Sequence, residues 1–312
     1  MLQMPFSETA IWQDFRRHSR TFSMATHLLP SEIRMHVATL YMYCRMIDNI
    51  ADEMALNEGK EQALSELARV ENHLLDVFTG KPSSSPFWQR LSGIHQQFTL
   101  SHKPMQELIE GARWDLTSQK VFSENDLLAY ANLVAGCVGA MMLPFLVQSQ
   151  DDRTALEPTA RALGNAMQIT NIIRDVGEDI RALNRIYLPE NWLNEAGLSP
   201  QMLYQDLPPV GYANLMERMM QLAEQLYIEG FKGIHRLPLR VRGGIRAAAR
   251  LYREILNEVR KNEYNNLTRR AYVPATRKIR LLLDNDYYRR RDALLPHNHP
   301  KRIYPPLFST SL

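Results

Sequence analysis

The sequence contains little cysteine and little glycine, and segments that alternate polar with apolar residues are scarce. Only Cys44 and Cys137 occur among the 312 residues, and their spacing is not that of a metal or redox site. These absences argue against a disulfide-stapled secreted fold and against a sheet-based domain. We expect both thiols to be free and buried in a reducing compartment. No apolar run with a cleavage site follows a charged N-terminus, so we expect no signal peptide.

A strong net charge and a glycine-rich dinucleotide fingerprint are also missing. The formal net charge is +3, and no nucleic-acid-binding motif accompanies the basic residues, so we expect no nucleic-acid partner. The positive charge is concentrated between Arg240 and Arg302. Three interpretations of this segment stay open: a solvated basic face, diphosphate binding near a site, and attraction to anionic lipid headgroups.

Helical periodicity of apolar residues extends from Glu8 to about Asp284. This pattern predicts one all-α domain spanning 1–312, with a core at about 8–284 and a loosely ordered tail at 285–312. Two segments, Lys81–Pro86 and Leu207–Gly211, have loop composition. Neither is expected to be a domain boundary.

A charge-free stretch, Leu127–Gln150, is long enough to cross a bilayer. It contains Asn132 and Pro144, and Asp126 and Asp151 bound it closely. A buried helix at the centre of the domain is therefore the better interpretation. Four small residues lie along it: Ala135, Gly136, Gly139 and Ala140. A helix of this kind either packs very close to a neighbour or leaves an open bore.

Two pairs of aspartates are the most informative feature of the chain. Asp48 and Asp52 form one pair, and Asp175 and Asp179 form the other. A spacing of four residues places both carboxylates of a pair on one helix face, one turn apart. Such carboxylates repel each other unless they bind a cation. Mg²⁺ suits them, because it binds through one or two carboxylates, several waters and substrate phosphates.

Each aspartate pair extends a polar stripe at helical spacing. The two stripes are Tyr41, Arg45, Asp48 and Asp52, and Gln168, Asn171, Asp175 and Asp179. Stripes with this spacing are usually apolar and buried. A solvated helix face is the alternative interpretation for one pair alone, and two aligned pairs favour a site over that alternative.

Three segments resemble motifs of the squalene/phytoene synthase family. They are HSRTFSMATHLLP near the N-terminus, YMYCRMIDNIADE and LGNAMQITNIIRDVGEDIRALNRIYLP. The resemblance covers about Ser19 to Val273. The sequence departs from many members at Asn49, where an acidic residue is common. Asn49 lies off the face of Asp48 and Asp52, so we expect little consequence.

This resemblance implies an isoprenoid-synthase-like helical bundle around a central cavity, with the charge-free helix lining an isoprenoid tunnel. It implies a prenyltransferase that condenses two geranylgeranyl diphosphates head to head, giving phytoene through prephytoene diphosphate. The alternative is a relative that uses farnesyl diphosphate and makes presqualene diphosphate, dehydrosqualene or squalene. Squalene would require NADPH, and none is expected for phytoene. The small residues Thr26 and Ala38 favour the longer substrate if they border the tunnel.

The resemblance also assigns roles to individual residues. It implies two or three Mg²⁺ ions, for which Mn²⁺ can substitute, held by Asp48, Asp52, Asn171, Asp175 and Asp179. The four aspartates are implied as catalytic together with Tyr41 and Arg45. Substrate contacts are implied for a larger set: His18, Ser19, Arg20, Thr21, Tyr41, Arg45, Gln168, Arg174, Arg185, Tyr187, Tyr252 and Arg270.

The same resemblance implies prenyl diphosphates and a membrane surface as partners, with a downstream desaturase as a further one. We expect a cytoplasmic protein that associates peripherally with membranes, because its product would be an insoluble hydrocarbon. A non-catalytic scaffold subunit is the alternative from another class. All four aspartates are present, which disfavours that alternative.

Overall fold

The computed structural model describes residues 7–117 and 119–283, apart from the side chains of four residues: Arg20, Thr21, Leu282 and Leu283. This part of the chain is helical and contains no strand, which confirms the all-α prediction. The tail expected at 285–312 lies outside the described residues. The elements are α1 (Glu8–His18), α2 (Arg20–Thr26), α3 (Ser31–Asn49), η1 (Ile50–Met54), α4 (Ala55–Asn57), α5 (Lys60–Phe78), α6 (Pro86–Phe98), α7 (His102–Leu116), α8 (Glu124–Ala131), η2 (Asn132–Gly136), α9 (Cys137–Leu146), α10 (Gln150–Glu178), η3 (Asp179–Leu183), α11 (Glu190–Glu195), η4 (Pro200–Tyr204), α12 (Tyr212–Arg236), α13 (Leu239–Lys261) and α14 (Ala275–Leu283).

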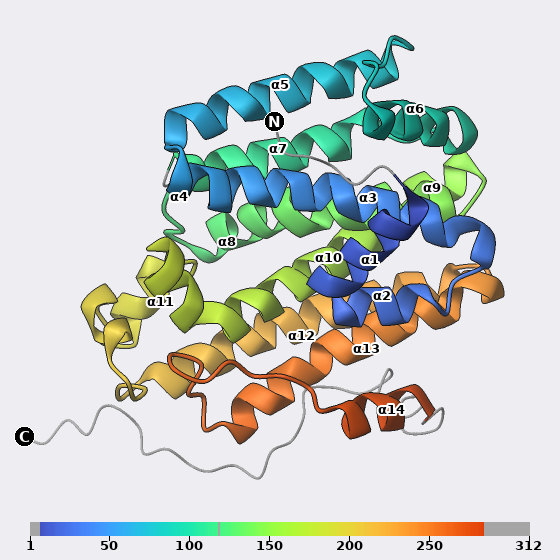
Figure 1. Ribbon diagram of the computed structural model, residues 1–312. Coiled ribbons are helices and arrows are strands. Elements are labelled where there is room, and N and C mark those ends of the chain that lie inside the picture. The colour runs from blue at the N-terminus through green and yellow to red at the C-terminus, as the bar shows by residue number, and fades with distance from the viewer. Residues whose placement is uncertain (1–6, 118, 284–312) are drawn as a thin grey trace, which may run out of the picture.

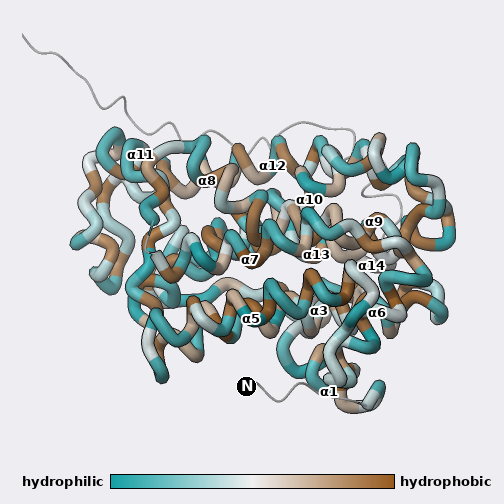
Figure 2. Tube along the Cα trace, turned by 90° about the horizontal axis from the view of Figure 1, so that it is seen from above, coloured by the Kyte–Doolittle hydropathy of each residue, from teal (hydrophilic) through white to brown (hydrophobic). Residues whose placement is uncertain are grey.

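Helix α10 runs through the middle of the bundle. Figure 1 shows α5, α6 and α7 on one side of it and α12, α13 and α14 on the other. Helix α10 contacts α9, η2, α12 and α13 along its length. Figure 2 shows hydrophobic and hydrophilic segments alternating along the helices, the pattern of amphipathic helices that bury one face.

Local sequence signals begin the helices around the site. The hydroxyl of Ser149 accepts a hydrogen bond from the Asp152 backbone N–H and starts α10, and Ser123 forms a capping box with Asp126 at the start of α8. Both predicted loops are confirmed. The first ends at Pro86, the first residue of α6, and the second ends at Gly211, whose φ of 91° suits glycine.

The hydrophobic core has two parts. One is built mainly from α10, α11, α12 and α13, and the other mainly from α1, α3, α5, α6, α7 and α9. Phe22, Val134 and Ile245 pack against both parts. A cavity lies between the two parts, and glycines let the surrounding helices approach closely. A Cβ at Gly164 of α10 would collide with the carbonyl oxygen of Ala135.

Most of the charge-free stretch lies in one continuous helix, Glu124–Leu146, made of α8, η2 and α9, while residues 147–149 connect it to α10. By length and composition it is the one helix in the described part of the chain that could cross a membrane. It packs against α7 and α10 inside the bundle, as expected of an internal helix. Several of its partly exposed residues, Val134, Val138 and Met142, line the cavity. Its hydrophobicity therefore serves both the core and the cavity wall.

The basic segment that begins at Arg240 does not form one solvated face. Arg253 bonds to Glu224 at 2.5 Å, and Arg260 bonds to Glu217 at 2.7 Å. Of the three interpretations of this segment, a solvated basic face does not apply to these arginines, which join α13 to α12. Because they are buried in ion pairs, they are not available to lipid headgroups.

Candidate active site

A polar cavity of about 520 Å³ lies where the C-terminal ends of α3 and α10 meet. The four aspartates Asp48, Asp52, Asp175 and Asp179 all line it. The prediction that the two pairs face one cavity is confirmed. Their role as metal ligands stays a prediction.

Each aspartate pair spans the boundary between an α-helix and a π-helical turn. Asp48 lies in the last turn of α3 and Asp52 lies in η1, while Asp175 lies in α10 and Asp179 opens η3. The wider π turn keeps residues four apart on one face, and such turns are frequent at functional sites. The loop that follows α13 also packs here. The backbone N–H of Gly177 donates to the carbonyl of Asn266 at 3.1 Å, and a Cβ at Gly177 would strike the carbonyl of Leu267.

Arginines already hold two of the four carboxylates. Arg185 donates to Asp52 at 2.6 Å and to the carbonyl of Ala51 at 2.9 Å. This arginine follows the second aspartate pair in sequence, so it ties that segment to the first pair. Arg45, on the first stripe, donates to Glu53 at 3.0 Å.

Asp175 lies between two guanidinium groups. Arg174 donates to its two carboxylate oxygens at 2.8 and 2.5 Å, and Arg270 contacts it at 2.9 Å. Arg270 also pairs with Glu178 at 3.1 Å. Three of the arginines predicted to contact substrate, Arg174, Arg185 and Arg270, are therefore concentrated around this cavity.

Asp48 and Asp179 differ from the other two aspartates, because neither carboxylate is directly paired within the part of the chain that the structure describes. No hydrogen bond or ion pair in the described part of the chain involves either carboxylate. Enclosure by protein raises the pKa of Asp48 to about 7, and nearby Asp52 adds to the shift. Burial, followed by repulsion from Asp175, raises the pKa of Asp179 to about 8. Both carboxyls are therefore poised to accept a cation.

The donor set at this cavity fits a hard divalent ion. The Oδ1 atom of Asn171 is buried without a hydrogen-bond partner, and Asn171 lines the cavity beside the unpaired Asp48 and Asp179. Among the described residues, no three His, Cys, Asp or Glu side chains converge on one point. Few protein ligands, all of them oxygen atoms, suit Mg²⁺ completed by waters and phosphates, and they do not suit zinc.

Asp115 also belongs to the site, although the sequence did not single it out. This carboxylate, on α7, accepts hydrogen bonds from Tyr187 at 2.8 Å and Tyr130 at 3.1 Å, and it lies 3.8 Å from Arg185. Burial raises its pKa to about 6. The sequence did carry a signal for Asp115, because the helical spacing of Leu108, Ala112 and Asp115 places them on one helix face. All three line the polar cavity. A single aspartate on an apolar helix is too common to reveal this by itself.

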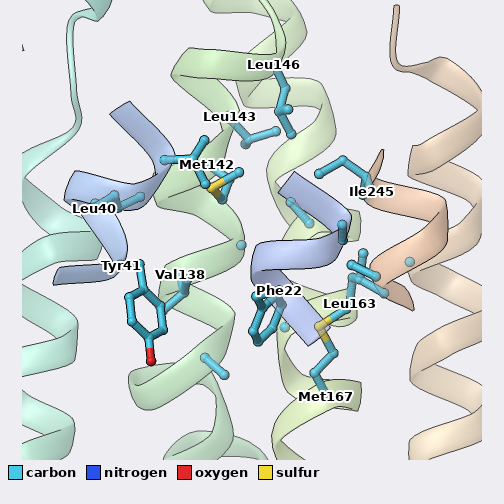
Figure 3. Close-up of a pocket in the computed structure, with 18 of the residues that line it drawn as sticks. Phe22, Leu40, Tyr41, Val138, Met142, Leu143, Leu146, Leu163, Met167 and Ile245 are labelled. Atoms are coloured by element: carbon cyan, nitrogen blue, oxygen red, sulfur yellow. The ribbon is translucent and has the colours of Figure 1, made fainter. Parts of the chain in front are cut away.

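An apolar cavity of about 310 Å³ continues from the polar one. Asp48, Gln168 and Asn171 line both cavities. Figure 3 shows the Tyr41 hydroxyl directed toward the end at which Met167 lies, with Leu143 and Leu146 at the opposite end. The cavity thus runs from the polar site toward the N-terminal ends of α3 and α10.

Several predicted substrate residues do not line either cavity. His18 is exposed and contacts Asp14, and Ser19 caps α2. The side chains of Arg20 and Thr21 lie outside the described set. Tyr252 is buried beside Arg174, and its ring centroid lies 4.8 Å from that of Phe22. It therefore contacts residues that line the two cavities without lining either cavity itself.

The two positions considered for substrate length have different environments. Thr26 is buried and lines the apolar cavity. Ala38 is fully buried in the core and is not among the lining residues, which include Val37, Leu40 and Tyr41 of the same helix. The condition that Ala38 borders the tunnel is therefore not met, because α3 presents a different face to the cavity.

Comparison with known proteins identifies the family. The squalene/phytoene synthase family matches residues 15–277. The chain is 34% identical to the phytoene synthase of Rhodobacter capsulatus, over 90% of this chain and 81% of that one. It is 34% identical to the chloroplastic phytoene synthase 2 of Solanum lycopersicum, over 94% and 92% of the two chains. It is 37% identical to the chloroplastic phytoene synthase 3 of Zea mays, but it spans only 62% of that relative's length.

Solved structures agree with this match. A dehydrosqualene synthase in complex with a ligand superposes with a TM-score of 0.82 at 31% identity, over 91% of this chain and 96% of that one. The squalene synthase HpnC from Alicyclobacillus acidocaldarius superposes with a TM-score of 0.73 at 24% identity, over 84% and 97% of the two chains, and shares the fold. The predicted helical bundle around a central cavity is confirmed. With a family match over most of its length and relatives that are prenyltransferases, the chain belongs to the squalene/phytoene synthase family of enzymes that join prenyl groups head to head.

Proposed function

We propose that the chain condenses two geranylgeranyl diphosphates to phytoene through prephytoene diphosphate, with Mg²⁺ as the metal. The observation that carries the proposal is the junction of the two cavities at Asp48, Gln168 and Asn171. A carboxylate-lined and arginine-lined space suits a metal-bound diphosphate, and the adjoining apolar space suits a long hydrocarbon tail. The junction offers both environments to one amphiphilic substrate.

Asp48, Asp179 and Asn171 would hold the metal, because their oxygens are unpaired. Bound there, Mg²⁺ would supply positive charge that stabilises the departing diphosphate. Arg185 and Arg270 carry donors aimed into the same space, and guanidinium groups bind phosphate oxygens through paired charge-assisted hydrogen bonds. When the substrate binds, both arginines would exchange hydrogen bonds to aspartate for hydrogen bonds to the diphosphate.

The walls of the apolar cavity would protect the carbocation left after diphosphate departs. Water would quench such a cation, so the chemistry requires a cavity with few nucleophiles. Lining residues such as Val138, Met142 and Leu163 offer none. The face of Tyr41 could steady the positive charge at the polar end.

The dimensions of the cavity support a long tail. Lining residues of α10 run from Leu156 to Asn171, and that length of helix rises about 22 Å. Thr26 leaves the wall open where a bulky aromatic would close it. A farnesyl-using reaction is the second candidate, because a solved relative at 31% identity is a dehydrosqualene synthase.

Product analysis tests the proposal. Purified protein should be incubated with Mg²⁺ and an equimolar mixture of farnesyl and geranylgeranyl diphosphates, without NADPH, and the hydrocarbons identified by mass spectrometry. Phytoene as the main product supports the proposal. A C30 product would instead establish the farnesyl-using candidate. Absence of any condensation product from either substrate would favour the scaffold alternative.

Replacement of the unpaired carboxylates tests the metal site. Asp48→Ala and Asp179→Ala should each lower turnover by about a hundredfold or more, because charge stabilisation of the leaving group is lost. Asp206→Asn, an exposed aspartate outside both cavities, is the matched control. Turnover of either alanine variant within a few-fold of the parent would count against the assignment. Thermal melts should show that both variants remain folded.

The cellular setting belongs to the same proposal. A cytoplasmic enzyme bound peripherally to a membrane could deliver phytoene directly to lipid and to a downstream desaturase. An insoluble product supports this location, because it cannot accumulate in water. Release from isolated membranes by high salt without detergent is the expected behaviour, and a need for detergent would contradict peripheral binding.

A further inference from the structure

The apolar cavity ends behind two turns of the chain. One is the α2–α3 turn, residues 27–30, and the other is the α12–α13 turn, residues 237–238, which leads into Leu239 at the start of α13. Leu29 and Leu237 line the cavity, while their neighbours Leu28 and Leu239 are exposed to solvent by 49% and 81%. Only one layer of side chains therefore separates the cavity from the surface at these turns.

The two turns lie side by side. Arg240 pairs with Glu32 at 3.4 Å across them, and Figure 1 shows both turns at the same end of the bundle. Gly244 of α13 makes room for Leu29, since a Cβ at that position would lie 2.7 Å from the leucine side chain. Leu29 and Leu237 thus close the end of the cavity together.

The backbone carbonyl of each of these two leucines accepts a hydrogen bond from an arginine. Arg34 donates to the carbonyl oxygen of Leu29 at 2.7 Å, and Arg242 donates to that of Leu237 at 2.7 Å. Neither arginine forms an ion pair with any carboxylate in the part of the chain that the structure describes. A guanidinium bound to a neutral carbonyl would bind an anionic phosphate more strongly.

The surface around the turns is apolar and cationic. Met24, one helical turn before Leu28, is 38% exposed. Arg236 is exposed and donates a hydrogen bond to the carbonyl of Ala155 at 3.3 Å. Exposed leucine and methionine ringed by arginine are the features that bind anionic lipid surfaces. At the opposite end, Leu207 and Val210 are also exposed, but they flank no lining residue of the apolar cavity.

We propose that these two turns dock on an anionic bilayer and form the exit for the hydrocarbon product. Leu28 and Leu239 enter the headgroup region, and lipid phosphates draw Arg34 and Arg242 away from the carbonyls that they hold. The turns then loosen, and Leu29 and Leu237 part to release product into lipid. This inference rests on the proposed function, because only an apolar product needs such a route.

Vesicle binding tests the docking step without any substrate. The protein should sediment with phosphatidylcholine vesicles that contain phosphatidylglycerol, and salt should weaken the binding. Leu28→Asp/Leu239→Asp should bind about tenfold more weakly or worse, whereas the matched control Leu207→Asp/Val210→Asp should bind like the parent. Loss of binding in the control alone, or no binding by the parent protein, would overturn the docking surface.

Pre-steady-state kinetics test the exit. Product should form in a burst followed by slower turnover, and anionic vesicles should raise the slow rate without changing the burst. The Leu28→Asp/Leu239→Asp variant should keep the burst and lose the stimulation, and Arg34→Gln/Arg242→Gln should lose most of the stimulation. Equal stimulation by neutral vesicles would contradict the proposal that anionic lipid phosphates draw Arg34 and Arg242 away from the carbonyls. Failure to form any product would instead overturn the proposed function and leave the vesicle-binding result intact.

Discussion

At the scale of single residues, counter-ions divide the four aspartates into two kinds. Asp52 and Asp175 are neutralised by arginines, while Asp48 and Asp179 have no partner among the described residues. The ion pairs of the first kind reduce the repulsion among the four carboxylates. The second kind keeps oxygen ligands available for a cation, at a cost to the stability of the metal-free protein.

That cost should depend on pH. Because the folded-state pKa of Asp179 is raised to about 8, the unfolded chain loses its proton first as the pH rises. Ionisation in the folded state is unfavourable, so this group lowers the stability of the metal-free protein progressively between about pH 4 and pH 8. Asp179→Asn should flatten the fall of the thermal midpoint over this range. Equal pH dependence in the variant and in the control Asp206→Asn would refute the assignment.

Substrate length should depend on Thr26 and not on Ala38. Thr26→Phe would fill the cavity that Thr26 lines, and excluding one five-carbon unit removes about 4 kcal/mol of apolar burial. Competition assays should show a strong shift toward farnesyl diphosphate. Ala38→Phe is the matched control. It should leave the product ratio unchanged and destabilise the core by about 1–3 kcal/mol, because Ala38 is fully buried. A shift with Ala38→Phe alone would reverse this interpretation.

At the scale of elements, the site depends on how closely α10 approaches its neighbours. Glycines on α10, α12 and α13 let backbone meet backbone or side chain without an intervening Cβ. Three π-helical turns, η1, η2 and η3, occur where the helices border the polar cavity. Close approach sets the width of the cavity, and the π turns direct the polar side chains into it.

Gly164→Ala tests this close approach. A methyl group there would meet the carbonyl of Ala135, so the free energy of unfolding should fall by about 1–3 kcal/mol. Gly243→Ala is the control on α13, where a Cβ has open space, and it should stabilise the helix by about 0.5–1 kcal/mol. Urea denaturation of both variants measures the difference. Similar effects of the two substitutions would show that the contact between η2 and α10 tolerates a wider spacing.

At the scale of the whole molecule, two core clusters flank one continuous cavity. The cavity removes apolar contacts that a solid bundle would have, and ligands that fill it restore them. Ligand binding should therefore raise the unfolding temperature by mass action.

The two parts of the cavity should contribute separately to this effect. Inorganic diphosphate with Mg²⁺ should raise the thermal midpoint by occupying the polar part. A long-chain alkyl diphosphate with Mg²⁺ should raise it further, since each buried CH₂ is worth about 0.8 kcal/mol. Chelation of the metal should abolish most of both shifts. An alkyl diphosphate that stabilises no more than inorganic diphosphate would show that the tail does not enter the apolar cavity.

The sequence by itself determined the helices and the polar stripes. Helical periodicity and loop composition are local properties, so the all-α fold and the loops ending at Pro86 and Gly211 could be predicted. Each aspartate pair could be placed on one helix face because residues four apart share a face, and the resemblance to the family implied that the two pairs serve one metal site. The free state of Cys44 and Cys137 followed in the same way from their number and context, and the structure leaves both unpaired.

Only the tertiary structure decided which residues from different helices meet. Asp115 joins the site because α7 packs beside α3 and the segment that follows η3 brings Tyr187 to it. Ala38 is excluded because α3 turns another face to the cavity. The arginines of α13 became structural ion pairs because carboxylates on α12 face them. Such contacts depend on the rotation and spacing of whole helices, which are set by packing across the entire core and not by local sequence.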